Sequence, residues 1–215
     1  MGAIARSAAN NITTSGVFTS SAIANSSVTG ITVLANASDG ITLISSQTAS
    51  NSASISFTSG LDSTYKAYKF VFSNINPATD NVFFDFNLST DAGSNYNVTK
   101  TTTAFRAYDT EGGAAPTLEY YPGIDLAQST AFQNIVGEAG SGADESISGS
   151  LILFNPSSTT YVKHFLTNSN QNTYHDLTMN TFIAGYGNTT SAVNAVQFKC
   201  SSGNFDGVIY LYGIK

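Results

Sequence analysis

Apolar and polar residues alternate with a period of two along much of the chain. Tyr68, Phe70 and Phe72 share one side of residues 67–72, and residues 82–88 repeat the pattern. Because successive side chains of a β-strand point to opposite faces of its sheet, this period predicts strands with one buried face.

A predicted hairpin at residues 146–165 stands at the centre of this pattern. Two apolar runs, 151–154 and 161–166, flank the segment NPSSTT at 155–160. A proline followed by hydroxyl residues between β-rich runs is typical of a turn. The first run becomes apolar on both faces, as expected of a strand in the middle of a two-layer protein.

Nine or ten strands are predicted after residue 50, and the later ones lie near 98–108, 179–186, 193–200 and 207–214. The least regular part, residues 109–145, is predicted to contain one short helix at 126–135. This number and spacing of strands predict an all-β fold, an antiparallel β-sandwich that is jelly-roll-like.

Residues 1–50 differ from the rest, since they are rich in Ser, Asn and Ala and contain one aromatic residue. Ordering a residue costs about 1–2 kcal/mol, which their short apolar segments cannot offset alone. We therefore expect an extended N-terminal arm that packs on partner chains for anchoring and oligomerisation, followed by a head domain at 51–215. The predicted interface positions are Ile4, Ile12, Val17, Phe18, Ile23, Val28, Ile31 and Val33.

Charge is sparse, at 10% of residues, with a net charge of -6 and a pI near 4.6. Nucleic-acid binding requires a basic surface to neutralise phosphates, so this balance argues against a nucleic-acid partner. No run approaches 18 apolar residues, and no membrane insertion is predicted. Cys200, the single cysteine, is predicted to be a buried small apolar residue rather than a nucleophile.

Catalytic and metal-binding patterns are weak, and we predict no catalytic residue, no metal site and no cofactor. His164 lies on an apolar strand, where a core or interface histidine is the favoured interpretation. A calcium loop at Asp91, Asn95 and Asn97 does not follow the usual order of ligands. Five acidic residues of the irregular region are the candidates for a glycosidase pair: Glu119, Asp125, Glu138, Asp144 and Glu145.

Loop aromatics are the best candidates for binding a ligand. Tyr120, Tyr121 and Tyr174 are predicted to lie in loops, with His175 next to the last of them. An exposed ring stacks on the face of a sugar, and neighbouring Asn and Ser side chains bond its hydroxyls. The competing interpretation is that these rings pack over the ends of the sandwich or between subunits.

Several segments resemble a family of small virion structural proteins of marine tailed bacteriophages, of the cyanophage and pelagiphage type. The segments are MGAIARSAANNITT at 1–14, FTSGLDSTY at 57–65, FSNINPATDNV at 72–82, TTTAFRAY at 101–108, LFNPSSTTYVKHF at 153–165 and YGIK at 212–215. The resemblance implies a structural or tail-fibre-like component of the virion. No catalytic residues come with it.

We therefore expect a non-enzymatic appendage on the exterior of a virion, assembled in the host cytoplasm. A homotrimer is expected, because three arms wound together can bury the Ile and Val residues that one arm leaves exposed. The arm would bind other virion proteins, and the head would contact a host surface glycan. The alternatives are a capsid decoration protein and, less favoured, a polysaccharide depolymerase.

Overall fold

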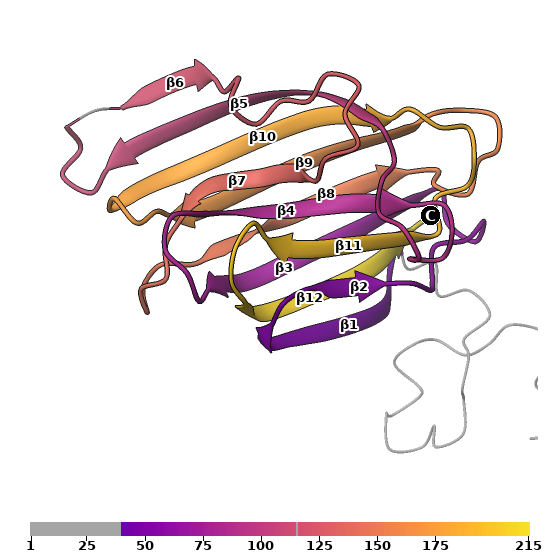
Figure 1. Cartoon of the computed structure of the whole chain (residues 1–215), viewed down its shortest axis with the longest axis horizontal. Helices are drawn as coiled ribbons and strands as arrows, with labels where there is room; N and C mark the ends of the chain where they lie inside the picture. Colours follow the sequence, from indigo (N-terminus) through magenta and orange to yellow (C-terminus); the bar gives the residue numbers. More distant parts are fainter. Residues whose placement is uncertain (1–39, 115) are drawn as a thin grey trace, which may run out of the picture. The chain divides into compact units, whose positions relative to one another are not determined.

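The computed structural model describes residues 40–114 and 116–215 (Figure 1). The chain divides into two units, Met1–Ser38 and Asp39–Lys215, and the described residues belong to the second. All of the regular secondary structure in these residues is β-strand. The strands are β1 (Ile41–Ser52), β2 (Ile55–Phe57), β3 (Ala67–Pro77), β4 (Val82–Ser89), β5 (Lys100–Thr110), β6 (Thr117–Tyr120), β7 (Gln133–Ala139), β8 (Ile147–Phe154), β9 (Lys163–Asn172), β10 (Leu177–Gly187), β11 (Ala195–Cys200) and β12 (Phe205–Ile214).

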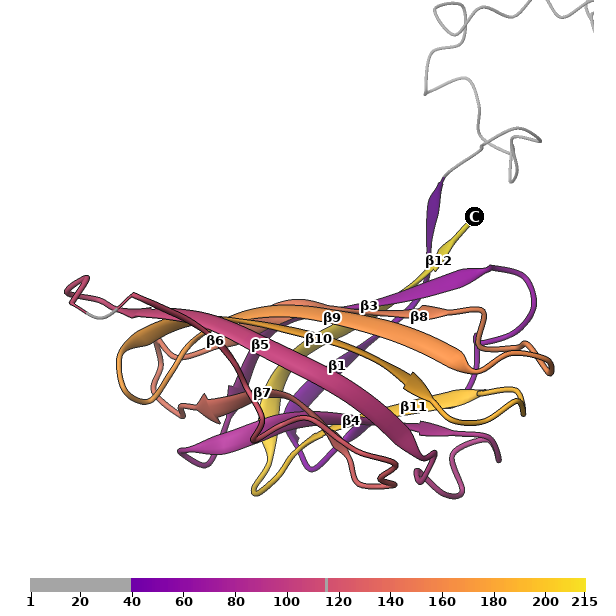
Figure 2. The same ribbon diagram turned by 90° about the horizontal axis from the view of Figure 1, so that it is seen from above.

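The strands form two antiparallel sheets that pack face to face as a β-sandwich (Figure 2). The large sheet has eight strands in the order β1-β12-β3-β8-β9-β10-β5-β6, and the small sheet has four in the order β2-β11-β4-β7. The predicted all-β sandwich is confirmed.

The strand order is that of a jelly roll. Eight pairs of consecutive strands are split between the two sheets. Four of these pairs together make up the jelly roll: β1 and β2, β3 and β4, β7 and β8, and β11 and β12. The chain therefore winds around the core, and β1-β12-β3-β8 faces the whole small sheet, as in a double-sheet jelly roll.

Two insertions widen the large sheet beyond this jelly roll. β5 and β6 come between β4 and β7 in the sequence, whereas β9 and β10 come between β8 and β11. The insertions pair with each other, because β10 is hydrogen-bonded to both β9 and β5. The large sheet is thus twice as wide as the small one.

The core between the sheets is dominated by phenylalanine. Phe198 on β11 lies at its centre, and its ring centroid is 5.4 Å from that of Phe70 and 5.9 Å from that of Phe84. Tyr68, Phe70 and Phe72 are all buried, as their shared face predicts. Edge-to-face and offset contacts of this kind add about 0.5–1.5 kcal/mol per pair beyond the burial of area.

The predicted central hairpin is present as β8 and β9, which pair antiparallel from Ile147 with Gln171 to Leu153 with Phe165. Asn155 begins the turn with φ of 45°, and the backbone N–H of Ser158 donates to its carbonyl at 3.1 Å. Asparagine tolerates this left-handed conformation better than most residues, so the turn forms where the sequence indicates it.

The helix predicted at 126–135 is wrong. Backbone groups of Leu126 and Ser129 are bonded to those of Thr102 and Lys100 at the start of β5. The segment is therefore extended alongside β5, and its last three residues form the start of β7 at Gln133. Pairing with a neighbouring strand has satisfied the backbone groups that a helix would have used.

The boundary predicted at residue 50 is corrected by β1. This strand begins at Ile41 and pairs with β12 as far as Ser52, and Ala49 within it is buried in the core. The head therefore includes residues 41–50. Their small polar residues obscured the strand because they form an edge with one face open to solvent.

Candidate functional site

The most prominent surface of the described head is the outer face of the large sheet, which is the side turned away from the small sheet. Directly paired residues of neighbouring strands point to the same side of a sheet. The pairing registers, continued by one residue at Phe154 with His164 and at Ser73 with Ser148, therefore define four rows of outward side chains that cross the sheet. A shorter fifth row, beyond the fourth, consists of Asn172, Thr178 and Asp109. We call these rows the outer face.

Each of the four full rows runs from β1 toward β6, and these rows are listed from the end of β1 at Ile41. The first is Ile41, Ile214, Ala67, Phe154, His164, Tyr186 and Thr101; the second is Leu43, Tyr212, Lys69, Ile152, Leu166, Ala184 and Thr103; the third is Ser46, Tyr210, Val71, Ser150, Asn168, Phe182, Phe105 and Tyr120; the fourth is Thr48, Val208, Ser73, Ser148, Asn170, Asn180, Ala107 and Leu118.

Exposed apolar residues concentrate on this face. Nine large apolar or aromatic residues of the described head are exposed, and eight of them belong to these rows, the exception being Tyr161. Leu118 is 74% exposed, Ile41 55% and Leu166 47%. Single exposed apolar residues are common, but a contiguous group of this width usually marks an interaction surface.

Aromatic rings form the part of the outer face nearest β6. Phe105 and Phe182 are stacked, with ring centroids 4.9 Å apart and planes inclined by 13°. Tyr120, which is paired with Phe105, is held in place because its hydroxyl donates to Asp125 at 2.5 Å. That hydrogen bond raises the pKa of Tyr120.

Small residues between large ones leave hollows in this surface. One hollow of about 310 Å³ is lined by Phe105, Leu166 and Phe182, with Ala184 among the residues that complete it. A larger and more polar hollow, of about 490 Å³, lies over Ser148, Ser150 and the asparagines of β9 and β10. The outer face therefore has depressions that can receive side chains of a partner.

Three asparagines form the polar part of the face. The side-chain amide of Asn180 donates to the side-chain oxygen of Asn168 at 3.1 Å, and that of Asn170 donates to the carbonyl of Met179 at 3.2 Å. The side-chain oxygen of Asn180 is buried and has no hydrogen-bond partner among the described residues. This acceptor is available to a donor from a bound molecule.

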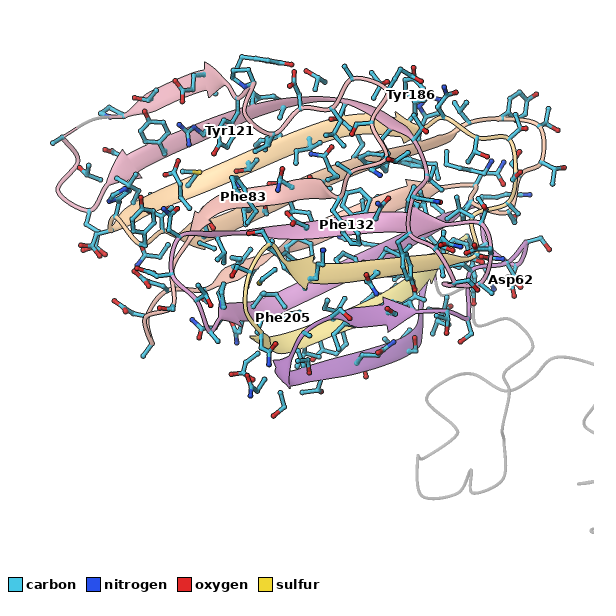
Figure 3. All side chains as sticks on the ribbon, in the orientation of Figure 1. Asp62, Phe83, Tyr121, Phe132, Tyr186 and Phe205 are labelled. Carbon is cyan, nitrogen blue, oxygen red and sulfur yellow. The ribbon has the colours of Figure 1, made fainter. Side chains whose placement is uncertain are left out.

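Formal charge is nearly absent from the outer face. Lys69 is the one Asp, Glu, Lys or Arg in the four full rows, and Asp109 lies in the shorter fifth row, although the whole chain has 14 acidic and 8 basic residues. His164 and Tyr186 add a ring pair with centroids 6.1 Å apart, and Tyr186 lies near the end of β10 (Figure 3). His164 is thus on the exposed side of its strand, not in the core.

The four residues predicted to bind a ligand lie in three places. Tyr120 belongs to the outer face, and Tyr121 turns to the inner side, where it packs against the core (Figure 3). Tyr174 and His175 form the turn between β9 and β10, with ring centroids 3.8 Å apart. The structure therefore does not bring these residues into one pocket.

Tyr121 belongs to a charged cluster around Arg106. The guanidinium lies 4.0 Å from the centroid of the Tyr121 ring and bonds Glu119 at 2.8 Å and Glu138 at 2.9 Å. Burial opposes the charge of Arg106, but the hydrogen bonds that it donates to Glu138 and Glu119 outweigh burial and raise the pKa of Arg106. Two of the candidate catalytic carboxylates are therefore paired with one arginine.

Two further candidate carboxylates are also held by neighbours. Asp125 accepts the Tyr120 hydroxyl, and Glu145 accepts the backbone N–H of Gly142. At the candidate calcium loop, hydrogen bonds from Asn95 and Ser89 lower the pKa of Asp91 to about 2. Within residues 40–114 and 116–215, no three His, Cys, Asp or Glu side chains gather as metal ligands do.

Three Asp or Lys side chains are buried inside the described head. Burial lowers the pKa of Lys100 to about 7, and its ammonium donates to the carbonyl of Val98 at 2.8 Å and to the side-chain oxygen of Asn87. Burial also lowers the pKa of Lys163, whose ammonium donates to backbone carbonyls of the adjoining loops. Asp85, with a pKa raised by burial to about 6, accepts the amide of Asn134 at 2.7 Å.

Cys200 is buried, as predicted, and burial raises the pKa of its thiol to about 12. A thiol in this state is protonated at neutral pH and is a poor nucleophile.

The predicted interface positions between Ile4 and Val33 lie outside the described residues. Among the described residues, no helix is long and apolar enough to cross a membrane.

The chain matches no protein-family model and no curated protein. Its function must therefore be argued from the arrangement of its own residues.

Sequence reasoning did not find the outer face. Alternation shows which residues share a side of a strand, but it does not show which side another layer covers. The available signal was Ile152, which lies on a strand whose opposite side, with Leu151 and Leu153, is also apolar. Such strands are expected to be covered on both sides.

Proposed function

We propose that this chain is a non-enzymatic structural component of a tailed-phage virion, a homotrimeric appendage of the tail-fibre type. The segment that precedes β1 anchors it to other virion proteins, and the β-sandwich head projects outward. The observation that carries an assembling role is the outer face, a wide and nearly uncharged sheet surface that presents eight exposed large apolar or aromatic residues. Such a surface suits lasting protein contact better than turnover of a substrate.

The state of the acidic residues supports a role without catalysis. A glycosidase needs two carboxylates facing one another across a groove, with the acid held neutral by its surroundings. Here Glu119 and Glu138 both bind Arg106, and Asp125 binds Tyr120. The location on a virion is supported by the resemblance of the segments quoted above to virion structural proteins.

Antibody labelling of purified phage particles tests this proposal. An antibody raised against the head is expected to label the tail region in electron micrographs, and the same antibody absorbed with purified head is the control. Label spread over the shell would favour a capsid decoration protein instead. Particles that lack the chain altogether, by labelling and by mass spectrometry, would overturn the proposal.

A turnover assay tests the non-enzymatic part separately. Purified protein incubated with polysaccharide of the phage host is expected to release no reducing ends. Release that is abolished by the double substitution Glu119→Gln and Asp125→Asn would reveal a depolymerase.

A further inference from the structure

The outer face exposes too much apolar surface to stay uncovered. Leu166, Phe154 and Phe182 are 47%, 39% and 37% exposed, and they lie on three adjacent strands in the middle of the large sheet. Monomeric soluble proteins rarely leave contiguous apolar patches larger than a few hundred Å² in water. We infer that this face is the interface between copies of the same chain.

The size of the face fits a lasting contact between proteins. Eight strands spaced about 4.8 Å apart, crossed by four rows about 6.7 Å apart, cover about 38 Å by 27 Å, which is on the order of 1,000 Å². A stable interface of standard size buries about 800 Å² on each partner. The outer face is therefore large enough to hold a second copy without help from other surfaces.

The distribution of charge favours a second copy over a different partner. The chain carries a net charge of -6, so its acidic surfaces repel one another, yet no carboxylate lies in the four full rows, and Asp109 stands at their edge. In a contact between copies, a carboxylate faces another surface of the same acidic chain, which makes it costly. A basic or acidic partner would need complementary charges, and the rows offer only Lys69 and Asp109.

The shape of the outer face also suits a contact in which side chains of two copies interdigitate. Ala184 leaves room for the apolar hollow of about 310 Å³ bounded by Leu166 and Phe182. Leu118, at 74% exposure, is a protruding apolar side chain in the same four rows. Knobs and hollows on one surface allow copies to pack closely, as the centres of interfaces do.

This inference supplies the contact surface of the proposed trimer, and it rests on the proposed function only for the number of copies. The test uses the purified full-length chain, apart from any particle. The double variant Leu166→Thr and Phe154→Thr removes two apolar side chains but keeps residues that suit a strand. Tyr161→Thr is the matched control, since Tyr161 is 69% exposed but lies off the face.

Sedimentation analysis is expected to give an oligomer for the wild type and for Tyr161→Thr. The double variant is expected to shift to the monomer mass at the same concentration, with a circular dichroism spectrum like that of the wild type. A wild-type chain that is monomeric at tens of micromolar would overturn the inference.

A second readout does not depend on that variant. Cys200 is buried, so Leu166→Cys introduces one reactive thiol on the outer face. A short bismaleimide is expected to join copies of Leu166→Cys, whereas Tyr161→Cys is expected to stay unjoined. An oligomer of unchanged mass in which Leu166→Cys is not joined would overturn the inference, because the copies would meet elsewhere. Either failure leaves the location on a virion untouched, and absence from the particle leaves the interface untouched.

Discussion

Phe105 on β5 and Phe182 on β10 stack on the solvent side of the large sheet, with ring centroids 4.9 Å apart. They are directly paired residues of neighbouring strands, and they are 45% and 37% exposed. Two rings held in this way lose little freedom when a partner covers them, because each already restricts the other. The pair is thus a preformed part of the outer face.

A double-mutant cycle measures how strongly these rings hold each other. Phe105→Ala and Phe182→Ala are each expected to lower the free energy of unfolding, and the combined variant to lose less than their sum. Stacked aromatic pairs are coupled by about 0.5–1.5 kcal/mol beyond area burial, and urea unfolding curves measure that difference. The control cycle combines Phe105→Ala with Tyr161→Ala in the β8–β9 loop, where additive losses are expected. Additive losses in the first cycle would show that the rings merely lie near each other.

Substitution of Phe198 is expected to destabilise the head strongly, because its ring is fully buried in the core. It packs against Phe57, Phe70, Phe84 and Phe86, so it joins both sheets. Phe198→Ala is expected to lower the free energy of unfolding by about 3–5 kcal/mol, through lost burial and the cavity it leaves. Phe198→Leu should cost less. Tyr161→Ala, an exposed control, should stay within about 0.5 kcal/mol in the same urea titration. Equal losses for Phe198→Ala and the control would mean that the core is not centred on this ring.

Phe198 is buried between the sheets, whereas Phe105 is exposed on the outer face. This difference shows which features of the fold could be predicted from the sequence. Alternation predicted most of the strands and the buried faces of β3 and β4, because it reports directly on the side that each residue takes. It could not predict that β9, β10, β5 and β6 extend past the small sheet, since that depends on which distant strands pair. The same gap hid the outer face and led to the helix assigned at 126–135.

The candidate site shows a further limit. Tyr120 and Tyr121 are adjacent in the sequence and were grouped as ligand residues, but the strand period places their rings on opposite sides of the sheet. The ring of Tyr121 is covered by the Arg106 guanidinium. Aromatic residues clustered in sequence therefore need not share a surface when they end a strand.

Lys100 predicts how stability depends on pH. Its pKa in the folded protein is about 7, against 10.5 for a free side chain, because burial disfavours its charge. Between these values the unfolded chain binds a proton that the folded chain has mostly released. Stability is therefore expected to rise as the pH increases from about 7 to about 9. Above about 9 the buried Cys200 thiol, whose pKa is raised from 9.0 to about 12, opposes the rise, because the unfolded chain loses a proton that the folded chain keeps.

Urea titrations at pH 7, 8 and 9 check this dependence. Lys100→Met should flatten the rise, and Lys163 should supply what remains, since burial lowers its pKa as well. Lys69→Met on the outer face is the control and should keep the slope of the wild type. A Lys100→Met protein with an unchanged slope would show that Lys100 keeps its charge inside the fold.

Two N-terminal deletions locate the boundary of the head. Removal of residues 1–39 spares β1 and is expected to leave the melting temperature of the head close to that of the full chain. Removal of residues 1–50 takes away most of β1, including the buried Ala49, and exposes the backbone edge of β12. If this loss is about 3 kcal/mol, the melting temperature falls by roughly 6–12 °C for a domain of this size.

The shorter deletion also separates folding from assembly into the particle. Because it keeps the complete sandwich, its failure to join phage particles would be due to loss of the proposed anchor and not to an unstable head. We expect it to be soluble and folded, by circular dichroism and calorimetry, and absent from particles when supplied in place of the full chain. The full chain with Ala49→Asp, which buries a carboxylate in the core, is the reverse case, with its anchor intact and its head destabilised. Incorporation of the 1–39 deletion at the level of the wild type would place the anchor within the head, and the outer face would then be the first surface to examine for it.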